Sequence, residues 1–303
     1  MKIAYEDRNF SKKSLGRIEQ ANTIIDEYEA QGFTLTLRQL YYQFVARNLL
    51  ENTGRSYKRI GKLIRDARMA GHVSWTAIED RGRSLVEWLK EEDERNVFRD
   101  LERRFALDYW SRQGVYVEVW IEKAALRNII ERPCSAYRVP HLGCIGYLSI
   151  SEIWRAAHER FERAAAEGRR CVLIHLGDHD PSGLDMTRDN KDRLDRLTDI
   201  ASVEIRRIAL NIDQVVHYNP PPNPTKETDT RAAEYVQRFG NHSWELDALE
   251  PSVIEELIES ELDSLIDFDV WAETKEEEDE RRSVLARVHD RWDDIVEMLG
   301  GAA

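Results

Sequence analysis

The sequence predicts an α/β protein in three parts: a basic helical domain, a parallel β-sheet domain and an acidic helical segment. Apolar residues recur at helical spacing through residues 11–70. From Gly114 onward, short β-branched and apolar runs alternate with helical segments, which indicates a parallel sheet with helices on its faces. We place the parts at residues 1–85, with a linking helix at 86–113, then 114–250 for the sheet domain and 251–303 for the acidic segment.

Charge is distributed unevenly along the chain. The net charge of −13, taken whole, argues against a nucleic-acid partner. Residues 1–83, however, contain 15 basic and 10 acidic side chains, whereas residues 245–303 contain 5 basic and 20 acidic ones. The basic first part therefore remains a candidate for contact with a polyanion.

Targeting signals and cysteines bear on the compartment. The start, MKIAYEDRNF, has no apolar stretch typical of a signal peptide, and no segment approaches the roughly 18 apolar residues of a membrane span. Cys134, Cys144 and Cys171 are odd in number and lack the spacing of metal ligands. We expect a soluble, cytoplasmic protein with no membrane attachment and with buried, reduced thiols.

The second predicted helix separates two adjacent tyrosines. Its apolar residues fall at i, i+3, i+4, i+7 and i+8 and share one face; they are Leu37, Leu40, Tyr41, Phe44 and Val45. Tyr41 is therefore expected in the core. Tyr42 lies one step round the helix, and Arg38 lies one turn before it, close enough for side-chain contact. We expect Tyr42 to be exposed beside a cation.

The first helix is expected over residues 11–31, and the third, over about 56–70, presents a basic face. Its apolar residues share one side, while Lys58, Lys62 and Arg65 lie on the other and Arg55 extends the row. After Gly71, the segment HVSWTAIEDRGR suits a short strand and a basic turn, so two helices, a basic helix and a wing form a winged-helix arrangement. An ordinary solvated basic face explains the stripe equally well. The placement of Arg38 beside Tyr42 favours DNA.

Acidic residues follow two of the predicted strands. Strands are expected at 114–122, 139–146, 171–178 and 202–210, with helices near 123–131, 149–167 and 181–199 between them. In parallel sheets the functional groups gather at the carboxyl ends of the strands. Glu122 ends the first strand, and Asp178 and Asp180 end the third. We therefore expect these three carboxylates at one sheet edge.

Carboxylates placed together repel one another unless a cation joins them. Hard oxygen ligands of this kind suit Mg²⁺, or alternatively Mn²⁺. Asp178 and Asp180 can face one ion where Pro181 stops the strand, and Gly183 permits close approach of backbone or phosphate. Glu122 would complete the site or move a proton. The alternative is that the two aspartates only cap the following helix, for which one would suffice.

Three motifs in this chain resemble those of a known family. VWIEK, at the end of the first strand, and GDHDPSG, at the end of the third, resemble the Toprim domain of topoisomerases, primases and related nucleases. LRQLYY resembles the Arg-x-x-Tyr-Tyr motif of the A subunit of topoisomerase VI and of the eukaryotic protein that makes meiotic double-strand breaks. In that family a winged-helix domain precedes the Toprim domain. The resemblance covers about residues 15–250 and implies the same order here.

The resemblance also implies site roles. Tyr42, the second tyrosine of the pair, would attack a phosphodiester of double-stranded DNA and form a 5′-phosphotyrosyl link. Arg38 would stabilise the charge on the phosphate under attack. Glu122, Asp178 and Asp180 match the acids that bind magnesium in the family. Because the tyrosine of one subunit works with the metal site of the other there, the resemblance implies a homodimer.

Two later segments carry open roles. Four prolines at positions 220–224 predict an extended loop, from which Lys226 and Arg231 could reach DNA or the metal, although a plain rigid connector is the more common outcome. WELDAL, from residue 244, resembles an acidic segment that follows the Toprim core; whether Glu245 or Asp247 reaches the metal stays open. The acidic end is expected to form a packed helix with a solvated outer side.

Three functions remain open from the sequence. The first is a short, stand-alone relative of the topoisomerase VI A subunit, an isomerase-class enzyme that cleaves DNA through Tyr42. The second is a Toprim nuclease that hydrolyses DNA with a metal-activated water, and the third is a DNA-binding protein without catalysis. Few residues precede the TLRQLYY motif and the chain has no Gly-rich ATP-binding motif, so we do not expect a dedicated ATPase B subunit.

Overall fold

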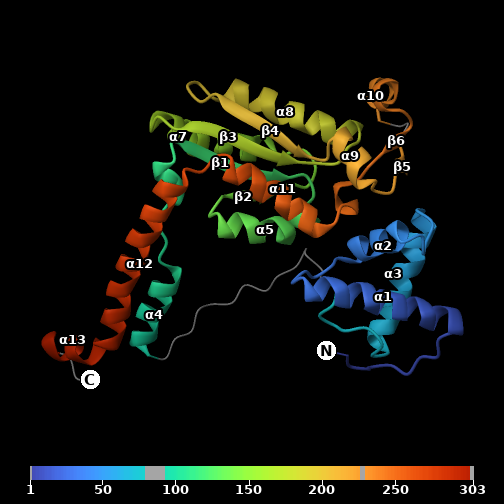
Figure 1. Cartoon of the computed structure of the whole chain (residues 1–303), viewed down its shortest axis with the longest axis horizontal. Helices are drawn as coiled ribbons and strands as arrows, with labels where there is room; N and C mark the ends of the chain where they lie inside the picture. Colours follow the sequence, from blue (N-terminus) through green and yellow to red (C-terminus); the bar gives the residue numbers. More distant parts are fainter. Residues whose placement is uncertain (1, 79–92, 226–228, 301–303) are drawn as a thin grey trace.

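The structure is a computed structural model that describes residues 2–78, 93–225 and 229–300. A body built on a β-sheet carries a helical domain at one end and a helical arm at the other (Figure 1). The sheet has four parallel strands covered by helices. The predicted α/β fold with a parallel sheet is therefore confirmed.

Three helices form the N-terminal domain: α1 (Lys12–Ala30), α2 (Leu37–Ala46) and α3 (Gly54–Met69). Each begins at a hydroxyl side chain that accepts a hydrogen bond from a backbone N–H of the first turn, which supplies a partner that the helix itself lacks. The capping residues are Ser11, Thr36 and Thr53. The three helices lie where the sequence predicts them and pack around one core.

The predicted wing is described only in part. Residues 71–78 form turns, and an isolated bridge pairs Ile78 with Leu35. No strand is formed over those eight positions, and the remainder of the predicted wing, residues 79–83, lies outside the described residues. The winged-helix assignment accordingly stays a prediction.

The sheet consists of β1 (Val115–Ile121), β2 (His141–Gly143), β3 (Arg170–Leu176) and β4 (Val203–Ala209), in the order β2-β1-β3-β4. All four lie close to the predicted ranges. Ile121 pairs with both Gly143 and Leu176, so β1, β2 and β3 end at the same edge. The residues that directly follow these three strands therefore lie together at this edge of the sheet.

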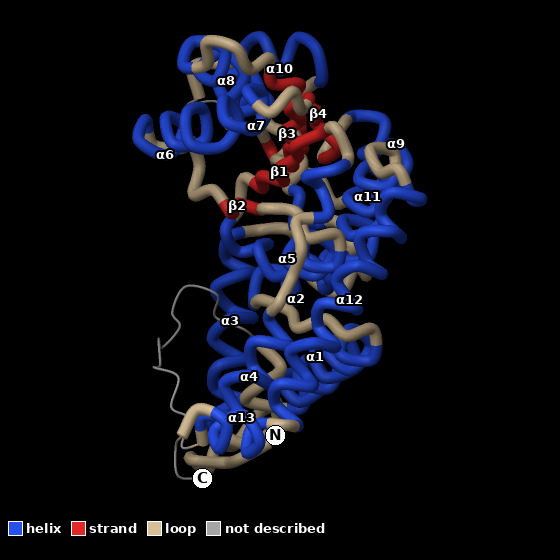
Figure 2. The backbone as a smooth tube through the Cα atoms, turned by 90° about the vertical axis from the view of Figure 1, so that its left-hand side faces the viewer, coloured by secondary structure: helices blue, strands red, loops and turns tan. Residues whose placement is uncertain are grey.

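Helices cover both faces of the sheet (Figure 2). The odd-numbered residues of β1 pack with α5 (Arg127–Ala136) and α11 (Pro251–Asp263). Trp120, on the opposite face, packs with α6 (Ile150–Arg155), the π-helical segment Ala156–Phe161, α7 (Glu162–Ala166) and α8 (Pro181–Leu197). Alternation along a strand thus places each side chain in one of two layers.

Shorter elements complete the body and its edge. They are 3₁₀ turns at Tyr109–Arg112, Ala124–Leu126 and Leu246–Ala248, helices α9 (Ile212–Tyr218) and α10 (Ala232–Phe239), and a two-stranded ribbon of β5 (Asn223–Pro224) and β6 (His242–Ser243). The three cysteines are free and buried, as expected. Across residues 2–78, 93–225 and 229–300, no helix combines the length and apolar character that crossing a membrane requires.

The arm consists of α4 (Glu94–Arg104), α12 (Phe268–Asp290) and α13 (Trp292–Met298). α4 lies in the range predicted for a linking helix, and it packs along α12 (Figure 1). Phe98 and Trp292 stack at the tip, where Arg95 also pairs with Asp293 at 2.6 Å. The acidic C-terminal helix is therefore packed on one side, as predicted.

One buried carboxylate anchors the arm to the body. Glu278, 1% exposed, accepts two hydrogen bonds from the Arg138 guanidinium at 2.6 and 2.7 Å and one from the Leu107 N–H at 2.7 Å. Arg138 also lies over the Tyr109 ring, 4.3 Å from its centre. The arm is thus held by a bidentate ion pair shielded from water.

Replacing this carboxylate tests the anchor. We expect Glu278→Ala to lower the free energy of unfolding by about 2–3 kcal/mol, because Arg138 and the Leu107 N–H both lose their acceptor. Glu280→Ala, at an exposed position on the same helix, is the control and should change it by no more than about 0.5 kcal/mol. Urea denaturation measures both; equal effects would contradict the anchoring role.

Candidate active site

The three predicted acids lie at the carboxyl edge of the sheet. Glu122 and Asp178 follow the paired ends of β1 and β3, and both are buried, at 9% and 6% exposure. The Oε2 atom of Glu122 accepts a hydrogen bond from the Asp178 N–H at 2.8 Å. Asp180 is the N-cap of α8, where its Oδ1 accepts from the Gly183 N–H at 2.6 Å. The capping role considered for the aspartates is thus filled by Asp180.

The loop between β3 and α8 is folded tightly around these acids. A Cβ atom on Gly183 would lie 2.2 Å from the Asp178 carbonyl oxygen and 2.9 Å from Glu122 Oε2, so only glycine fits there. Arg207 of β4 donates to the carbonyl oxygens of Gly177 and Asp178 at 2.9 and 2.7 Å. Burial lowers the pKa of Arg207 to about 10. The Arg207 guanidinium therefore holds the backbone of this loop in place.

Lys123 is a second cation at this edge, and it contacts three acids. Its Nζ lies 2.9 Å from Asp178 Oδ2, 2.9 Å from Glu245 Oε2 and 2.7 Å from Asp247 Oδ1. Burial opposes its charge, but Asp178 and Asp247 outweigh that effect and raise the pKa of Lys123. We call Lys123 and these three acids the lysine-centred cluster.

The acids of the edge differ in ionisation. Burial raises the pKa of Asp178 to about 8, against the opposing effect of Lys123. Burial also raises the pKa of Glu122 and of Asp247. Glu245 is half-buried, which opposes its charge, yet Lys123 and Arg38 lower its pKa to about 2. Glu245 therefore keeps its negative charge over the whole range in which the deeper acids take up protons.

The available oxygens limit how a metal would be held. Both oxygens of Asp178 are engaged, Oδ1 by the Leu246 N–H at 2.8 Å and Oδ2 by Lys123. Glu122 and Asp180 each keep one oxygen without a hydrogen bond to the residues described. Among the residues the structure describes, no group of three or more His, Cys, Asp or Glu side chains is arranged to hold a metal ion. Glu122 and Asp180 still fit Mg²⁺, which often takes only one or two carboxylates and completes its shell with water and phosphate.

The expectation that Tyr42 is exposed is wrong. Tyr42 is only 3% exposed, hardly different from Tyr41 at 4%. Tyr41 packs as predicted, and its hydroxyl accepts a hydrogen bond from the Thr53 N–H at 2.8 Å. Tyr42 packs in the same hydrophobic core as Tyr41, and the sheet domain completes its cover: Ala248 belongs to that core, and Asn223 donates to the Tyr42 hydroxyl at 3.5 Å. Helical periodicity reports only how a helix packs in its own domain.

Arg38 connects Tyr42 to the lysine-centred cluster. Its guanidinium lies 5.9 Å from the centre of the Tyr42 ring and pairs with Glu245 and, at 3.2 Å, with Asp247. Burial, Glu245 and Asp247 raise the pKa of Tyr42. The tyrosine is therefore a protonated phenol in this arrangement, adjacent to Glu245 and Asp247.

Further contacts between the two domains were missed from the sequence. Asn52 donates to the Pro222 carbonyl oxygen at 3.0 Å and to Asn223 Oδ1 at 2.7 Å. Tyr28 donates to Glu250. Nothing in their local sequence separates these residues from ordinary turn or helix positions. Lys123 and Arg207 did have a signal, since each is a charged residue inside or directly after an apolar strand.

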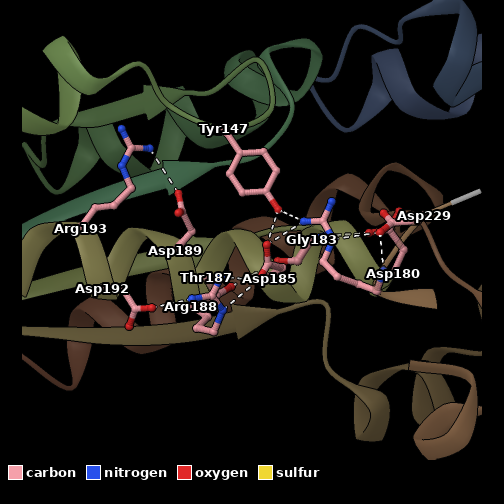
Figure 3. Close-up of polar contacts among 11 residues, drawn as sticks. Tyr147, Asp180, Gly183, Asp185, Thr187, Arg188, Asp189, Asp192, Arg193 and Asp229 are labelled. Carbon is pink, nitrogen blue, oxygen red and sulfur yellow. Dashed lines mark hydrogen bonds and ion pairs between the residues drawn. The ribbon is translucent and has the colours of Figure 1, made fainter. Parts of the chain in front are cut away.

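The remaining predicted residues divide into two groups. Arg55, Lys58, Lys62 and Arg65 of α3 are all exposed, as a nucleic-acid contact requires. Arg231 instead pairs with Asp185 of α8 at 2.6 Å and with Asp229 at 2.8 Å, and it also contacts Tyr147. Figure 3 shows the Tyr147 hydroxyl directed at Asp185. Arg231 thus joins a loop to α8, as a rigid connector would; Lys226 lies outside the described residues.

The fold and the edge together define a class: an α/β protein with clustered carboxylates at the carboxyl ends of parallel strands and a tyrosine packed beside them. No family model matches the chain, and no curated protein matches it either.

Removing the central cation tests the lysine-centred cluster. We expect Lys123→Met to lower the free energy of unfolding by roughly 3–5 kcal/mol, because three buried or half-buried carboxylates lose a shared partner. Lys191→Met, which removes an exposed i,i+4 pair with Asp195, should cost only about 0.3–0.5 kcal/mol. Magnesium should also raise the melting temperature of Lys123→Met more than that of the unaltered protein. An equal magnesium effect on both would argue against a cation position there.

A double-mutant cycle tests the contact between the domains. Arg38→Ala and Glu245→Ala should each destabilise the protein, and the double variant should be destabilised by less than the sum, with a coupling energy of about 1–3 kcal/mol. Pairing Arg38→Ala with Glu276→Ala on the arm is the control and should be additive. Strict additivity for Arg38 and Glu245 would contradict the contact.

Proposed function

We propose that this protein is a magnesium-dependent DNA-cleaving enzyme of topoisomerase VI A-subunit type that acts as a homodimer. One observation carries the proposal. Tyr42 and Arg38 of LRQLYY contact Glu245, Glu245 contacts Lys123 of VWIEK, and Lys123 contacts Asp178 of GDHDPSG. Three segments spread over about half the chain thus converge in one continuous polar network, and they are the segments that carry the family resemblance.

The reaction would be a transesterification at a DNA phosphate. The Tyr42 Oη atom forms a bond to phosphorus as the bond to the 3′ oxygen breaks; the phenol gives up its proton and the departing 3′ oxygen gains one. Arg38, released from Glu245 and Asp247, would stabilise the phosphate under attack. The product is a 5′-phosphotyrosyl link, which stores the energy of the broken bond.

Glu122 and Asp180 would hold the metal, with Asp178 kept close by Lys123. When bound, Mg²⁺ stabilises charge on the phosphate oxygens and on the leaving 3′ oxygen. Gly183 leaves room beside the Glu122 carboxylate, because a side chain there would strike Glu122. The chain's part in the chemistry is to place these oxygens at the sheet edge.

DNA would contact the exposed face of α3. Arg55, Lys58, Lys62 and Arg65 form a row suited to the phosphates of double-stranded DNA. The arrangement in a single chain covers Tyr42 with the sheet domain of the same chain, so DNA has to displace that contact. In the proposed homodimer, the displaced tyrosine would serve the acids of the partner subunit.

The second candidate function is hydrolysis by a Toprim nuclease, and the burial of Tyr42 favours it. A nuclease of this type needs only the metal at Glu122 and Asp180 and an activated water. Tyr42 would then be a packing residue. A third possibility, DNA binding without cleavage, shares the basic face and lacks any metal-dependent activity.

Tyr42→Phe separates covalent cleavage from hydrolysis. With supercoiled plasmid and Mg²⁺, stopped by detergent, the unaltered protein should yield linear DNA that carries bound protein. Tyr42→Phe should abolish that product, because the phenyl ring has no nucleophile. Tyr41→Phe, which removes the neighbouring hydroxyl from its contact with Thr53, is the matched control and should retain it.

The opposite results are equally clear. Cleavage by Tyr42→Phe that leaves protein-free ends would support the nuclease, and Glu122→Gln combined with Asp180→Asn should then abolish it. DNA binding without any magnesium-dependent cleavage, in the unaltered protein and in all variants, would reject both enzymes.

A further inference from the structure

Two adjoining pockets form a groove along the N-terminal domain. The first, of about 620 Å³, lies where the segment before α1 meets α1 and α3, and Phe10, Lys13 and Lys62 are among its walls. The second, of about 1010 Å³, extends to Tyr218 and to the prolines at 220–222. Arg17 and Arg59 line both pockets, so the two are continuous.

The groove carries positive charge that the protein does not neutralise. Lys13, Arg59 and Lys62 make no hydrogen bond or ion pair with any residue the structure describes. Of the two acids in the walls, Asp66 is already paired with Arg8 and Arg65, both at 3.0 Å, and Glu51 is a single charge in a groove with several cations. Free cations facing a concave surface indicate an anionic ligand.

Each pocket of the groove has an aromatic ring in its wall. Phe10 is half-buried in the first pocket, and Tyr218 is 37% exposed in the second. Cations that follow a backbone, together with aromatic faces on which bases can stack, are the features by which proteins bind unpaired strands. Each pocket has the volume of a site for a small ligand or a single nucleotide, which is too small for a duplex.

The groove leads towards the candidate nucleophile. Its second pocket is lined by Asn52 and Pro222, and Asn52 also binds Asn223, which donates to the Tyr42 hydroxyl. Arg55, Lys58 and Arg65 lie outside both pockets, on the open face of α3. The domain thus has two basic surfaces, the face of α3 and the groove, which meet at Lys62.

We propose that the groove binds an unpaired DNA strand and directs it towards Tyr42, while the open face of α3 binds duplex. The groove is a site in addition to the proposed cleavage centre, and its occupancy does not depend on Tyr42 acting as a nucleophile. Strand binding and strand cleavage are therefore measured separately.

Fluorescence anisotropy of labelled oligo(dT) and of a labelled blunt duplex, with the full chain, tests the assignment. Lys13→Gln combined with Arg59→Gln should weaken oligo(dT) binding about tenfold or more at low salt. The slope of log affinity against log salt should fall by about 0.7 for each phosphate that the variant no longer neutralises. Lys58→Gln combined with Arg65→Gln is the matched control on the open face and should weaken duplex binding instead.

Two additional variants make the result specific. Tyr218→Ala should weaken oligo(dT) binding about tenfold because a stacking surface is removed, with little effect on duplex. Lys191→Met, on α8 and outside both pockets, should bind oligo(dT) as the unaltered protein does. Equal weakening of oligo(dT) binding in both pairs of charge variants would overturn the proposal. A second result would also overturn it. If free dAMP competes with labelled oligo(dT) at the same nucleotide concentration as unlabelled oligo(dT), the groove is a pocket for a free nucleotide.

Discussion

The arrangement of this protein depends on one ammonium group. Lys123 lies within 2.9 Å of carboxylates from two parts of the chain, Asp178 at the end of β3 and Glu245 and Asp247 beyond the proline-rich loop. Three acids this close repel one another strongly in a buried setting. With the cation between them, the segment at 245–247 stays on the sheet edge, and Arg38 can attach the N-terminal domain to the same acids. The lysine thereby links the contact between the domains to the edge where a metal would act.

The features predicted well from the sequence are those that depend on neighbouring residues alone. The strands are short β-branched runs between turns, and the acids follow directly from where those runs end, so neither requires knowledge of the tertiary fold. Tyr42 shows the limit of such reasoning. Its helical phase separates it from the packing face of α2, yet Tyr42 packs in that core, and its surroundings include Asn223 and Glu245, which lie more than half the chain away. Lys123 was visible in VWIEK, yet two of its three partners, Glu245 and Asp247, are placed by the path of the proline-rich loop, which composition does not reveal.

The surroundings of Tyr42 and its proposed chemistry favour opposite states of the phenol. The structure covers it and keeps it protonated, whereas attack on a phosphate requires it to be accessible and to lose its proton. A phenol surrounded by Glu245 and Asp247 is held in its protonated form, because ionisation would place a third negative charge beside two others. The same two acids hold Arg38, the cation that would favour the phenolate. A DNA phosphate approaching Arg38 competes directly with Glu245 and Asp247 for one guanidinium. In the proposed reaction, opening the contact and activating the tyrosine would thus be the same electrostatic event.

Net charge is a poor guide to what this chain binds. Much of the excess acid lies in α12 and α13, on an arm at the opposite end of the sheet body from α3 (Figure 1). Part of that acid is neutralised within the arm and its base, where Arg138 pairs with Glu278, Arg112 with Glu277 and Arg95 with Asp293. Exposed charges farther apart than about 8–10 Å are largely screened at physiological salt. A polyanion at α3 therefore encounters the local row of lysines and arginines, and the acidic arm presents little barrier to its approach.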